Sequence, residues 1–339
     1  MSQIEILLLF FILNLFLVVN FEKIKILKFA IDKPDKQRKF HSRPVALAGG
    51  IILIINILLY FIFLNLSEKL IINEIIFDSF YEFNIFILIC LSIFFLGLVD
   101  DKINLNPNKK FLFLAIFLSL YLALDKEIII KTLELSFLDK TIYLGKFSFI
   151  FTLFCFLVFL NAFNMFDGIN LQSSTYVLVI LLYFFSLEIQ SLLILILIVF
   201  IIFFKFLNYS NKSFLGDGGT LLISFIISVF FIRLFNKGVI IHSDEIFIYL
   251  MIPGIDMIRL FFERIAKRRH PFSFDRNHIH HLLLSKLSYF NTIFVLIFLI
   301  SAPIILNFLK VDKLIIIIFS IIIYFLLVLI LKRNIKANQ

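Results

Sequence analysis

The feature that most constrains this sequence is its series of apolar runs, each long enough to cross a lipid bilayer. A helix needs roughly 20 apolar residues to span a hydrocarbon core of about 30 Å. Such runs recur along the whole 339-residue chain, in which 62% of residues are hydrophobic and 16% are charged. Soluble domains carry about 25% charged residues, so a soluble globule is excluded. We predict one all-α membrane domain, residues 1–339, with about 11 transmembrane helices.

The positions of the spans follow from hydropathy in a window of about 19 residues. The first run lacks a basic leading segment and a small-residue cleavage site, so we expect a retained span rather than a signal peptide. Residues 127–147 alternate apolar and polar side chains in places, which suits a short hairpin outside the membrane. The predicted spans lie near residues 4–21, 45–66, 84–99, 111–124, 148–163, 172–186, 191–207, 220–236, 245–261, 291–309 and 314–331.

The distribution of Lys and Arg predicts the orientation. With the carboxyl end inside, the inner segments hold 21 of the 32 basic residues and the outer segments hold 8, as expected for cytoplasmic loops. The net charge of +9 is therefore dispersed through short loops, without the aromatic-basic pattern of a nucleic-acid binder. The inner loops are expected near residues 22–44, 100–110, 164–171, 208–219 and 262–290.

Two adjacent carboxylates, Asp100 and Asp101, end the third span in the sequence GLVDDKINLNPNKKF. A solvated helix end is one interpretation. Ionised carboxylates at a membrane boundary are nevertheless costly unless they are hydrated, paired or bound to metal, and the dipole of a helix C-terminus disfavours anions. A divalent cation would relieve both problems. Oxygen ligands alone indicate Mg²⁺ or Mn²⁺ rather than zinc.

Two further carboxylates lie in glycine-containing turns on the same predicted side. Asp167 follows the fifth span in NAFNMFDGIN, a segment that could equally be a simple helix stop. Asp217 precedes the eighth span in FLGDGGT. Glycines let backbone amides approach phosphate, and a following helix N-terminus favours anions, although turns need glycine in any case.

Two basic segments complete the set. In KPDKQRKFHSRP most cations are interpreted as topogenic, and Lys39 and His41 are the exceptions because they lie close to the next span. The segment ERIAKRRHPFSFDRNHIHHLLLSK contains four of the six histidines, with His278 and His281 on one helical face. A solvated basic loop, a zinc site and an anion or nucleotide site are the alternatives, and zinc lacks a nearby cysteine. Cations and metal-binding carboxylates on one membrane face are the inventory of phosphoryl transfer.

At these residues the chain resembles the polyprenyl-phosphate N-acetylhexosamine-1-phosphate transferases, glycosyltransferase family 4. From about Asp32 to Leu284 the motifs follow the family's order: RKFH before GG, GLVDD before a basic stretch, NAFNMFDG, FLGD before a small residue pair, and PFSFDRNHIHH. The HIHH motif is similar to that of the WecA and TagO branch, whereas MraY carries a different histidine cluster. The resemblance implies an MraY/WecA-like fold.

The resemblance also implies a reaction. A sugar 1-phosphate, by default GlcNAc-1-phosphate, would pass from a UDP-N-acetylhexosamine to undecaprenyl phosphate, releasing UMP and initiating a cell-surface glycan. The implied cofactor is Mg²⁺, with Mn²⁺ as an alternative. The implied location is the cytoplasmic membrane of a bacterium, among membrane lipid, with the active site on the cytoplasmic face and with a homodimer as one compatible assembly. A direct attack and a covalent aspartyl-phosphate route both fit the residues.

Roles carried over from the family fall on named positions of this sequence. Asp100, Asp101 and Asp167 are implied to be catalytic, and Asp100, Asp101 and Asp217 to bind the metal. The substrate-binding residues implied by the resemblance are Lys39, His41, Lys110, Asn164, Asn170, Phe214, Gly216, His278, His280 and His281.

The sequence departs from the family pattern where an aspartate is usual, at Asn170, which Leu171 follows in place of glycine. An amide keeps hydrogen-bonding capacity but loses the charge. An MraY-like phospho-MurNAc-pentapeptide transferase is the alternative enzyme. A transporter of anionic metabolites should carry ionisable groups near the bilayer midplane, but Lys205, Arg233 and Asp256 lie near span ends. A membrane scaffold would not need aspartates in glycine-framed turns.

Overall fold

The computed structural model describes residues 3–34, 43–66, 76–187, 189, 191–271 and 275–336, and most of these residues are helical. Short 3₁₀ turns cover Lys25–Lys28, Lys126–Ile128 and Gly145–Phe147, and two small antiparallel sheets pair β1 (Ile31–Asp32) with β2 (Val45–Ala46) and β3 (Thr132–Leu133) with β4 (Ile142–Tyr143). The helices are α1 (Gln3–Val19), α2 (Gly49–Leu66), α3 (Phe80–Ile103), α4 (Pro107–Leu124), α5 (Ser148–Phe166), α6 (Gln172–Ser186), α7 (Leu192–Tyr209), α8 (Gly216–Asn236), α9 (Ser243–Ala266), α10 (Ile279–Leu284), α11 (Tyr289–Phe308) and α12 (Lys313–Lys336).

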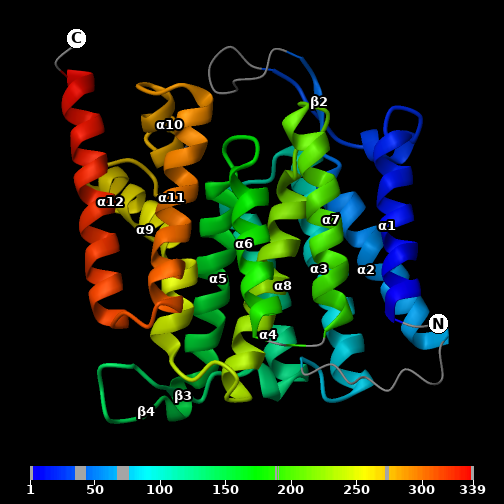
Figure 1. Cartoon of the computed structure of the whole chain (residues 1–339), viewed down its shortest axis with the longest axis horizontal. Coiled ribbons are helices and arrows are strands. Elements are labelled where there is room, and N and C mark those ends of the chain that lie inside the picture. Colours follow the sequence, from blue (N-terminus) through cyan, green and yellow to red (C-terminus); the bar gives the residue numbers. More distant parts are fainter. Residues whose placement is uncertain are drawn as a thin grey trace.

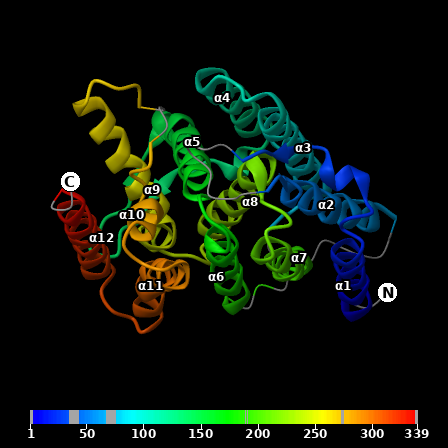
Figure 2. The same cartoon turned by 90° about the horizontal axis from the view of Figure 1, so that it is seen from above.

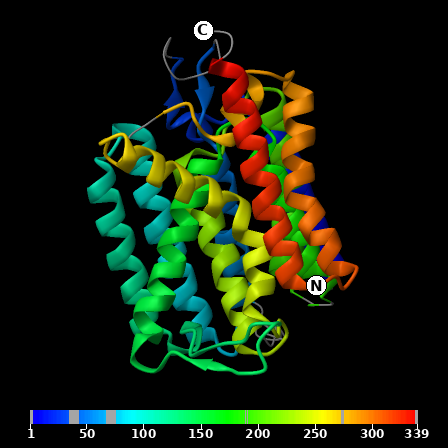
Figure 3. The same cartoon turned by 90° about the vertical axis from the view of Figure 1, so that its left-hand side faces the viewer.

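Each predicted span coincides with one of these helices, which confirms an all-α polytopic membrane protein. Within the described residues, eight helices are long and apolar enough to cross a membrane, and α1 and α6 are shorter apolar helices. Helix α9 is long but carries several charged side chains and Pro253 in its interior. Its second half runs outward from the bundle in Figures 2 and 3. The count of eleven spans therefore stays a prediction, while the hairpin predicted within residues 127–147 is confirmed as β3–β4.

Helix α8 is the centre of the bundle, and the other helices surround it in the view from above (Figure 2). The apolar window of α8 is completely buried by its neighbours. Glycines allow the closest contacts: a Cβ on Gly97 of α3 would lie 2.5 Å from Gly218 of α8, and one on Gly50 of α2 would lie 2.5 Å from Gly219. Small residues at helix interfaces permit the close backbone approach that drives helix association in lipid. The amino-terminal turn of α8 is thus fixed between α2 and α3.

The loops predicted to be inner lie at one end of the bundle. In Figure 1, β2, α10 and the carboxyl end of α12 are at the upper end, and the β3–β4 hairpin is at the opposite end. At that opposite end, the buried Arg233 forms ion pairs with Glu82, at 2.6 Å, and with Asp125. These contacts join the ends of α3, α4 and α8. They explain Arg233 as a structural ion pair rather than as a group on a transport path.

Candidate active site

The side chain of Lys110 is the meeting point of the predicted site. Its ammonium lies 2.8 Å from Oδ2 of Asp100 and 2.7 Å from Oδ2 of Asp217. It also donates to the amide oxygen of Asn164 at 3.3 Å. These four residues belong to α3, α4, α5 and α8. Three of the predicted inner motifs, together with the lysine that follows the paired aspartates, therefore converge on one cation.

Local sequence explains how Lys110 returns to Asp100. Helix α3 ends at Ile103 and is capped by Asn104, whose φ of 50° is left-handed and whose amide donates to the carbonyl of Asp100 at 2.8 Å. Helix α4 then begins at once, because Asn106 caps it and Pro107 occupies its first turn. Short polar side chains and proline favour this change of direction. The turn places the first residues of α4 beside the last turns of α3.

Asn164 connects the fifth helix to the eighth. Its amide nitrogen donates to Oδ1 of Asp217 and to Oγ1 of Thr220, both at 2.7 Å. Asp217 thus receives a cation on one oxygen and an amide on the other. A carboxylate held by charge-assisted hydrogen bonds is fixed in position, so the geometry around Asp217 is preorganised.

Asp101 has a different role from its neighbour. Its Oδ1 accepts the backbone amide of Asp217 at 2.7 Å, and its Oδ2 accepts that of Gly218 at 3.1 Å. It therefore caps the amino terminus of α8, because its oxygens accept backbone amides that have no partner within the helix. Gly216 has a φ of 72°, and a Cβ there would lie 2.7 Å from Oδ2 of Asp101. Glycine is needed at Gly216 for both reasons.

The loop before α8 is joined to the entrance of α2. Phe214 donates its amide to the carbonyl of Ala46 at 2.9 Å, and its own carbonyl accepts the amide of Gly49 at 3.1 Å. The carbonyl of Leu215 accepts the amide of Gly50 at 3.0 Å. Phe214 therefore contributes through its backbone to the position of the Asp217 turn.

Asp167 lies three residues after Asn164, at the end of α5, and its carboxylate accepts a hydrogen bond from the hydroxyl of Ser173. Burial is the main cause that raises the pKa of Asp167 to about 6, with the negative charge of Asp217 adding to it and the Ser173 bond opposing it. Asp167 therefore belongs to the neighbourhood of Asp217, but it is held by Ser173 rather than by Lys110.

Asn170, where the family usually has aspartate, lies in a cluster of amides. Its Nδ2 donates to Asn211 at 2.7 Å, its Oδ1 accepts from Asn208 at 3.3 Å, and its carbonyl accepts the hydroxyl of Tyr289 at 2.7 Å. An aspartate could not donate to the Asn211 oxygen. The amide thus suits this chain's own loop between α7 and α8.

The histidine motif is seated against the α5–α6 turn. A Cβ on Gly168 would lie 2.0 Å from Nε2 of His280, so the imidazole packs directly on the glycine backbone. The ring of His280 stacks on that of His278, with centroids 5.4 Å apart and an interplanar angle of 10°. His281 lies beside His280, with a centroid separation of 4.2 Å. The HIHH loop is therefore adjacent to the segment that carries Asn164.

The surroundings of these histidines keep two of them neutral at ordinary pH. Burial, followed by the neighbouring His278, lowers the pKa of His281 to about 4. Burial also lowers the pKa of His280 well below its usual value. Neutral imidazoles can accept or donate hydrogen bonds but add no charge.

A divalent cation fits this site in part. Mg²⁺ is usually held by one or two carboxylates together with water and substrate phosphates. Asp100 and Asp217 already converge on a positive group, the Lys110 ammonium. Among the described residues, no group of three or more His, Cys, Asp and Glu side chains could hold a metal ion by itself. Of the three predicted metal ligands, Asp100 and Asp217 would be available to hold the cation with a substrate supplying further ligands, whereas both oxygens of Asp101 accept backbone amides of α8.

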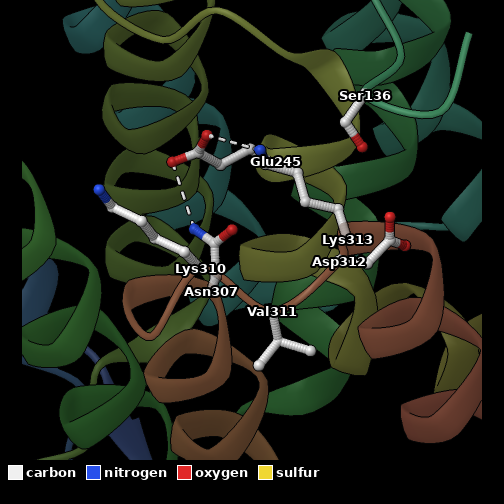
Figure 4. Close-up of a pocket in the computed structure, with 7 residues that line it drawn as sticks. All are labelled: Ser136, Glu245, Asn307, Lys310, Val311, Asp312 and Lys313. Carbon is white, nitrogen blue, oxygen red and sulfur yellow. Dashed lines mark hydrogen bonds and ion pairs between the residues drawn. The ribbon is translucent and has the colours of Figure 1, made fainter.

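Most of the predicted site residues are brought together. Asp100, Asp101, Lys110, Asn164 and Asp217 form one cluster. Phe214 and Gly216 lie at the start of α8 beside it, whereas Asp167 and Asn170 lie in the α5–α6 turn, against which His280 of the HIHH motif packs. Lys39 and His41 lie outside the described residues. Sequence reasoning missed Thr220 and Ser173, although each lies within six residues of a motif aspartate. A cavity of about 270 Å³, lined by Glu245, Asn307, Lys313 and neighbours (Figure 4), belongs to the other end of the bundle.

Comparisons with known proteins cover the part of the chain that carries these residues. The model of glycosyl transferase family 4 matches residues 83–235, which contain the whole Lys110 cluster. Undecaprenyl-phosphate alpha-N-acetylglucosaminyl 1-phosphate transferase of Salmonella typhi is 28% identical over 287 residues, covering 80% of this chain and 74% of that protein. The enzyme of the same name from Escherichia coli (strain K12) is 27% identical over 285 residues, with the same two coverages. The enzyme of the same name from Thermotoga maritima is 25% identical over 270 residues, covering 79% of this chain and 77% of that protein.

Proposed function

We propose that this chain is a member of glycosyl transferase family 4, whose model matches residues 83–235, and that it transfers N-acetylglucosamine 1-phosphate from UDP-GlcNAc to undecaprenyl phosphate. An oxygen of the lipid phosphate forms a bond to the β-phosphorus of the nucleotide sugar. The bond from that phosphorus to the oxygen bridging the two phosphates breaks, and UMP leaves. The observation that carries the proposal is the convergence of Asp100, Lys110, Asn164 and Asp217 from four helices.

Each residue of the cluster has a different role in this proposal. Lys110 neutralises the carboxylates of Asp100 and Asp217 in the free protein, and its ammonium can turn to phosphate oxygens when a substrate binds. Asp101 fixes the first turn of α8, which sets the position of Asp217. Asn164 holds the other oxygen of Asp217. Phosphoryl transfer depends mainly on such positioning and on electrostatic stabilisation.

A magnesium ion held by Asp100 and Asp217 would neutralise diphosphate charge and make UMP a better leaving group. Asp167 is a candidate proton acceptor because its raised pKa, about 6, lies near neutral pH. The acceptor phosphate is itself largely ionised near pH 7. Proton transfer to Asp167 would therefore assist the attack rather than drive it.

The membrane location suits such a pair of substrates. The lipid tail of the acceptor is membrane-soluble, while the nucleotide sugar is water-soluble, so the two phosphates can meet only at an interface. The cluster lies at the end of the bundle to which the basic loops belong. By the positive-inside rule this end faces the cytoplasm, and we place the site at the cytoplasmic face of the inner membrane of a bacterium.

The test is a reconstituted assay. Detergent-solubilised protein is incubated with undecaprenyl phosphate, Mg²⁺ and each of UDP-GlcNAc, UDP-GalNAc and UDP-QuiNAc, and UMP and the lipid product are measured. UMP release with UDP-GlcNAc, dependent on the lipid phosphate, is expected. No UMP from any sugar, with wild type indistinguishable from Asp101→Asn, would overturn the proposal, and activity with another sugar only would overturn the substrate assignment.

A further inference from the structure

A buried carboxylate on α9 is not used by the cluster described above. Asp256 is 2% exposed, and its Oδ2 lies 2.8 Å from Nδ1 of His278, the first residue of the HIHH motif. Burying a carboxylate is costly unless it is paired and hydrogen-bonded. Its partners therefore indicate what the chain retains it for.

The two oxygens of Asp256 serve different groups. Oδ1 accepts the hydroxyl of Tyr324 at 2.5 Å, the guanidinium of Arg259 at 2.8 Å and the amide of Ile279 at 3.2 Å. Oδ2 faces His278. One oxygen thus fixes the carboxylate between α9, α12 and the loop, and the other orients the imidazole.

The same network holds the backbone on both sides of His278. Arg259 donates to the carbonyl of Asn277 at 2.7 Å, and Asp256 accepts the amide of Ile279. Arg259 is also paired with Glu263 at 2.7 Å, so Asp256 is not needed merely to neutralise it. Three consecutive residues, from Asn277 to Ile279, are therefore clamped to α9. Such a clamp restricts both the position and the rotation of the His278 ring.

The direction of the ring connects this network to the active site. With Nδ1 committed to Asp256, Nε2 is the nitrogen with which His278 can contact a substrate. Its ring stacks on His280, which packs against Gly168 in the segment that carries Asn164. A carboxylate that accepts from one ring nitrogen determines the tautomer at the other.

We propose that Asp256 is a positioning residue that holds His278 by Nδ1 and thereby presents Nε2 to the diphosphate of the nucleotide sugar, with Tyr324 and Arg259 holding Asp256 in turn. This inference rests on the proposed function for its substrate but not for its geometry. It assigns a role to a residue of α9 and to one of α12, both of which lie outside residues 83–235.

A double-mutant cycle tests the proposal. Asp256→Asn should lower kcat/KM for UMP release about 30-fold, which is the size of loss typical when a carboxylate that orients a functional histidine is replaced. In a His278→Gln background the same substitution should cost less than about threefold, because residues that act through one another are not additive. If Asp256→Asn lowers kcat/KM by the same factor in the His278→Gln background as in wild type, the inference is overturned.

The matched control is Asp125→Asn, the same change at a buried ion pair at the other end of the bundle. It should lower the melting temperature without coupling to His278→Gln. If Asp256→Asn does not fold, Tyr324→Phe removes one hydrogen bond from Oδ1. That milder variant should lower kcat/KM about threefold, again only when His278 is present, and equal losses in both backgrounds would contradict the proposal.

A readout independent of activity separates this inference from the proposed function. In protein labelled with ¹⁵N-histidine, the His278 signals, assigned by their loss in His278→Gln, should report a proton on Nδ1 in wild type. They should change in Asp256→Asn, while the signals of His242 and His270 stay in place. An unprotonated Nδ1, or an unchanged His278 spectrum in the variant, would overturn the inference whether or not any UDP-sugar is turned over.

Discussion

Removal of the Lys110 charge is the perturbation for which the structure gives the clearest magnitude. Lys110→Met keeps most of the length of the side chain but leaves Asp100 and Asp217 without their shared cation, which lies 2.8 and 2.7 Å away. At an effective dielectric constant of about 20, each contact has a gross Coulomb energy of roughly 6 kcal/mol. Desolvation offsets most of it, and breaking a buried pair typically costs about 3–5 kcal/mol net.

This cost can be converted to a melting temperature. Proteins unfold with an entropy of about 2.1 cal/mol/K per residue, so a loss of about 3 kcal/mol over the 339 residues corresponds to roughly 4 °C. Mg²⁺ should restore much of the loss in Lys110→Met and change wild type less, because the variant exposes two carboxylates to it. The assay is thermal unfolding in detergent with and without Mg²⁺. UMP release should fall with the substitution in the same preparations.

The control is Lys146→Met, the same chemical change at an exposed residue at the other end of the bundle. A surface substitution of this kind changes stability by less than about 0.5 kcal/mol. If Lys110→Met melts with wild type, or responds to Mg²⁺ no more than wild type does, Lys110 is not the cation that balances the two carboxylates.

Three further predictions concern single residues. Gly168→Ala should lower UMP release about tenfold by displacing His280, since a Cβ would lie 2.0 Å from its ring, whereas Gly254→Ala, which meets nothing within 4 Å, should not. The folded-state pKa of His281, about 4, lies below the unfolded value of about 6.5, so the melting temperature should fall as pH drops from 6.5 to 4. His281→Gln should make the melting temperature depend less steeply on pH over this range, and an unchanged slope would contradict the prediction. Arg233→Met should lower the free energy of unfolding by about 3–5 kcal/mol, because its two carboxylate partners lose their cation. KM for the nucleotide sugar should stay unchanged, and a raised KM would show that this ion-pair network belongs to the substrate site.

Much of the fold is encoded locally, since each predicted span is an apolar run that becomes a helix. The boundaries that shifted are those set by distant partners. Helix α8 begins at Gly216 rather than near residue 220 because Asp101, on α3, caps its first turn. Helix α3 continues to Ile103 rather than ending near residue 99, and its last turn carries Asp100, which pairs with Lys110 of the next helix. Neither contact is visible in a local window of sequence.

The site divides in the same way. The motifs indicated which carboxylates and amides to expect, and the predicted topology put their loops on one membrane face. That Asp100 and Asp217 meet at Lys110 is known only from the structure. The division of labour between Asp100 and Asp101 could not be predicted, because it depends on which carboxylate reaches the amides of α8. The support of His278 by Tyr324 was equally hidden, since the loop after α9 and two helices, α10 and α11, separate α9 from α12 in the sequence.

The most direct test of the central claim compares two Asp→Asn substitutions in one UMP-release assay with UDP-GlcNAc and undecaprenyl phosphate. Asp217 lies in the Lys110 cluster, and Asp125 lies in the buried ion pair at the opposite end. If the cluster performs phosphoryl transfer, Asp217→Asn should lower kcat at least about 100-fold, while Asp125→Asn should retain kcat within about threefold in protein that remains folded. Equal losses in the two variants, or an Asp217→Asn variant as active as wild type, would contradict the assignment of this cluster as the active site.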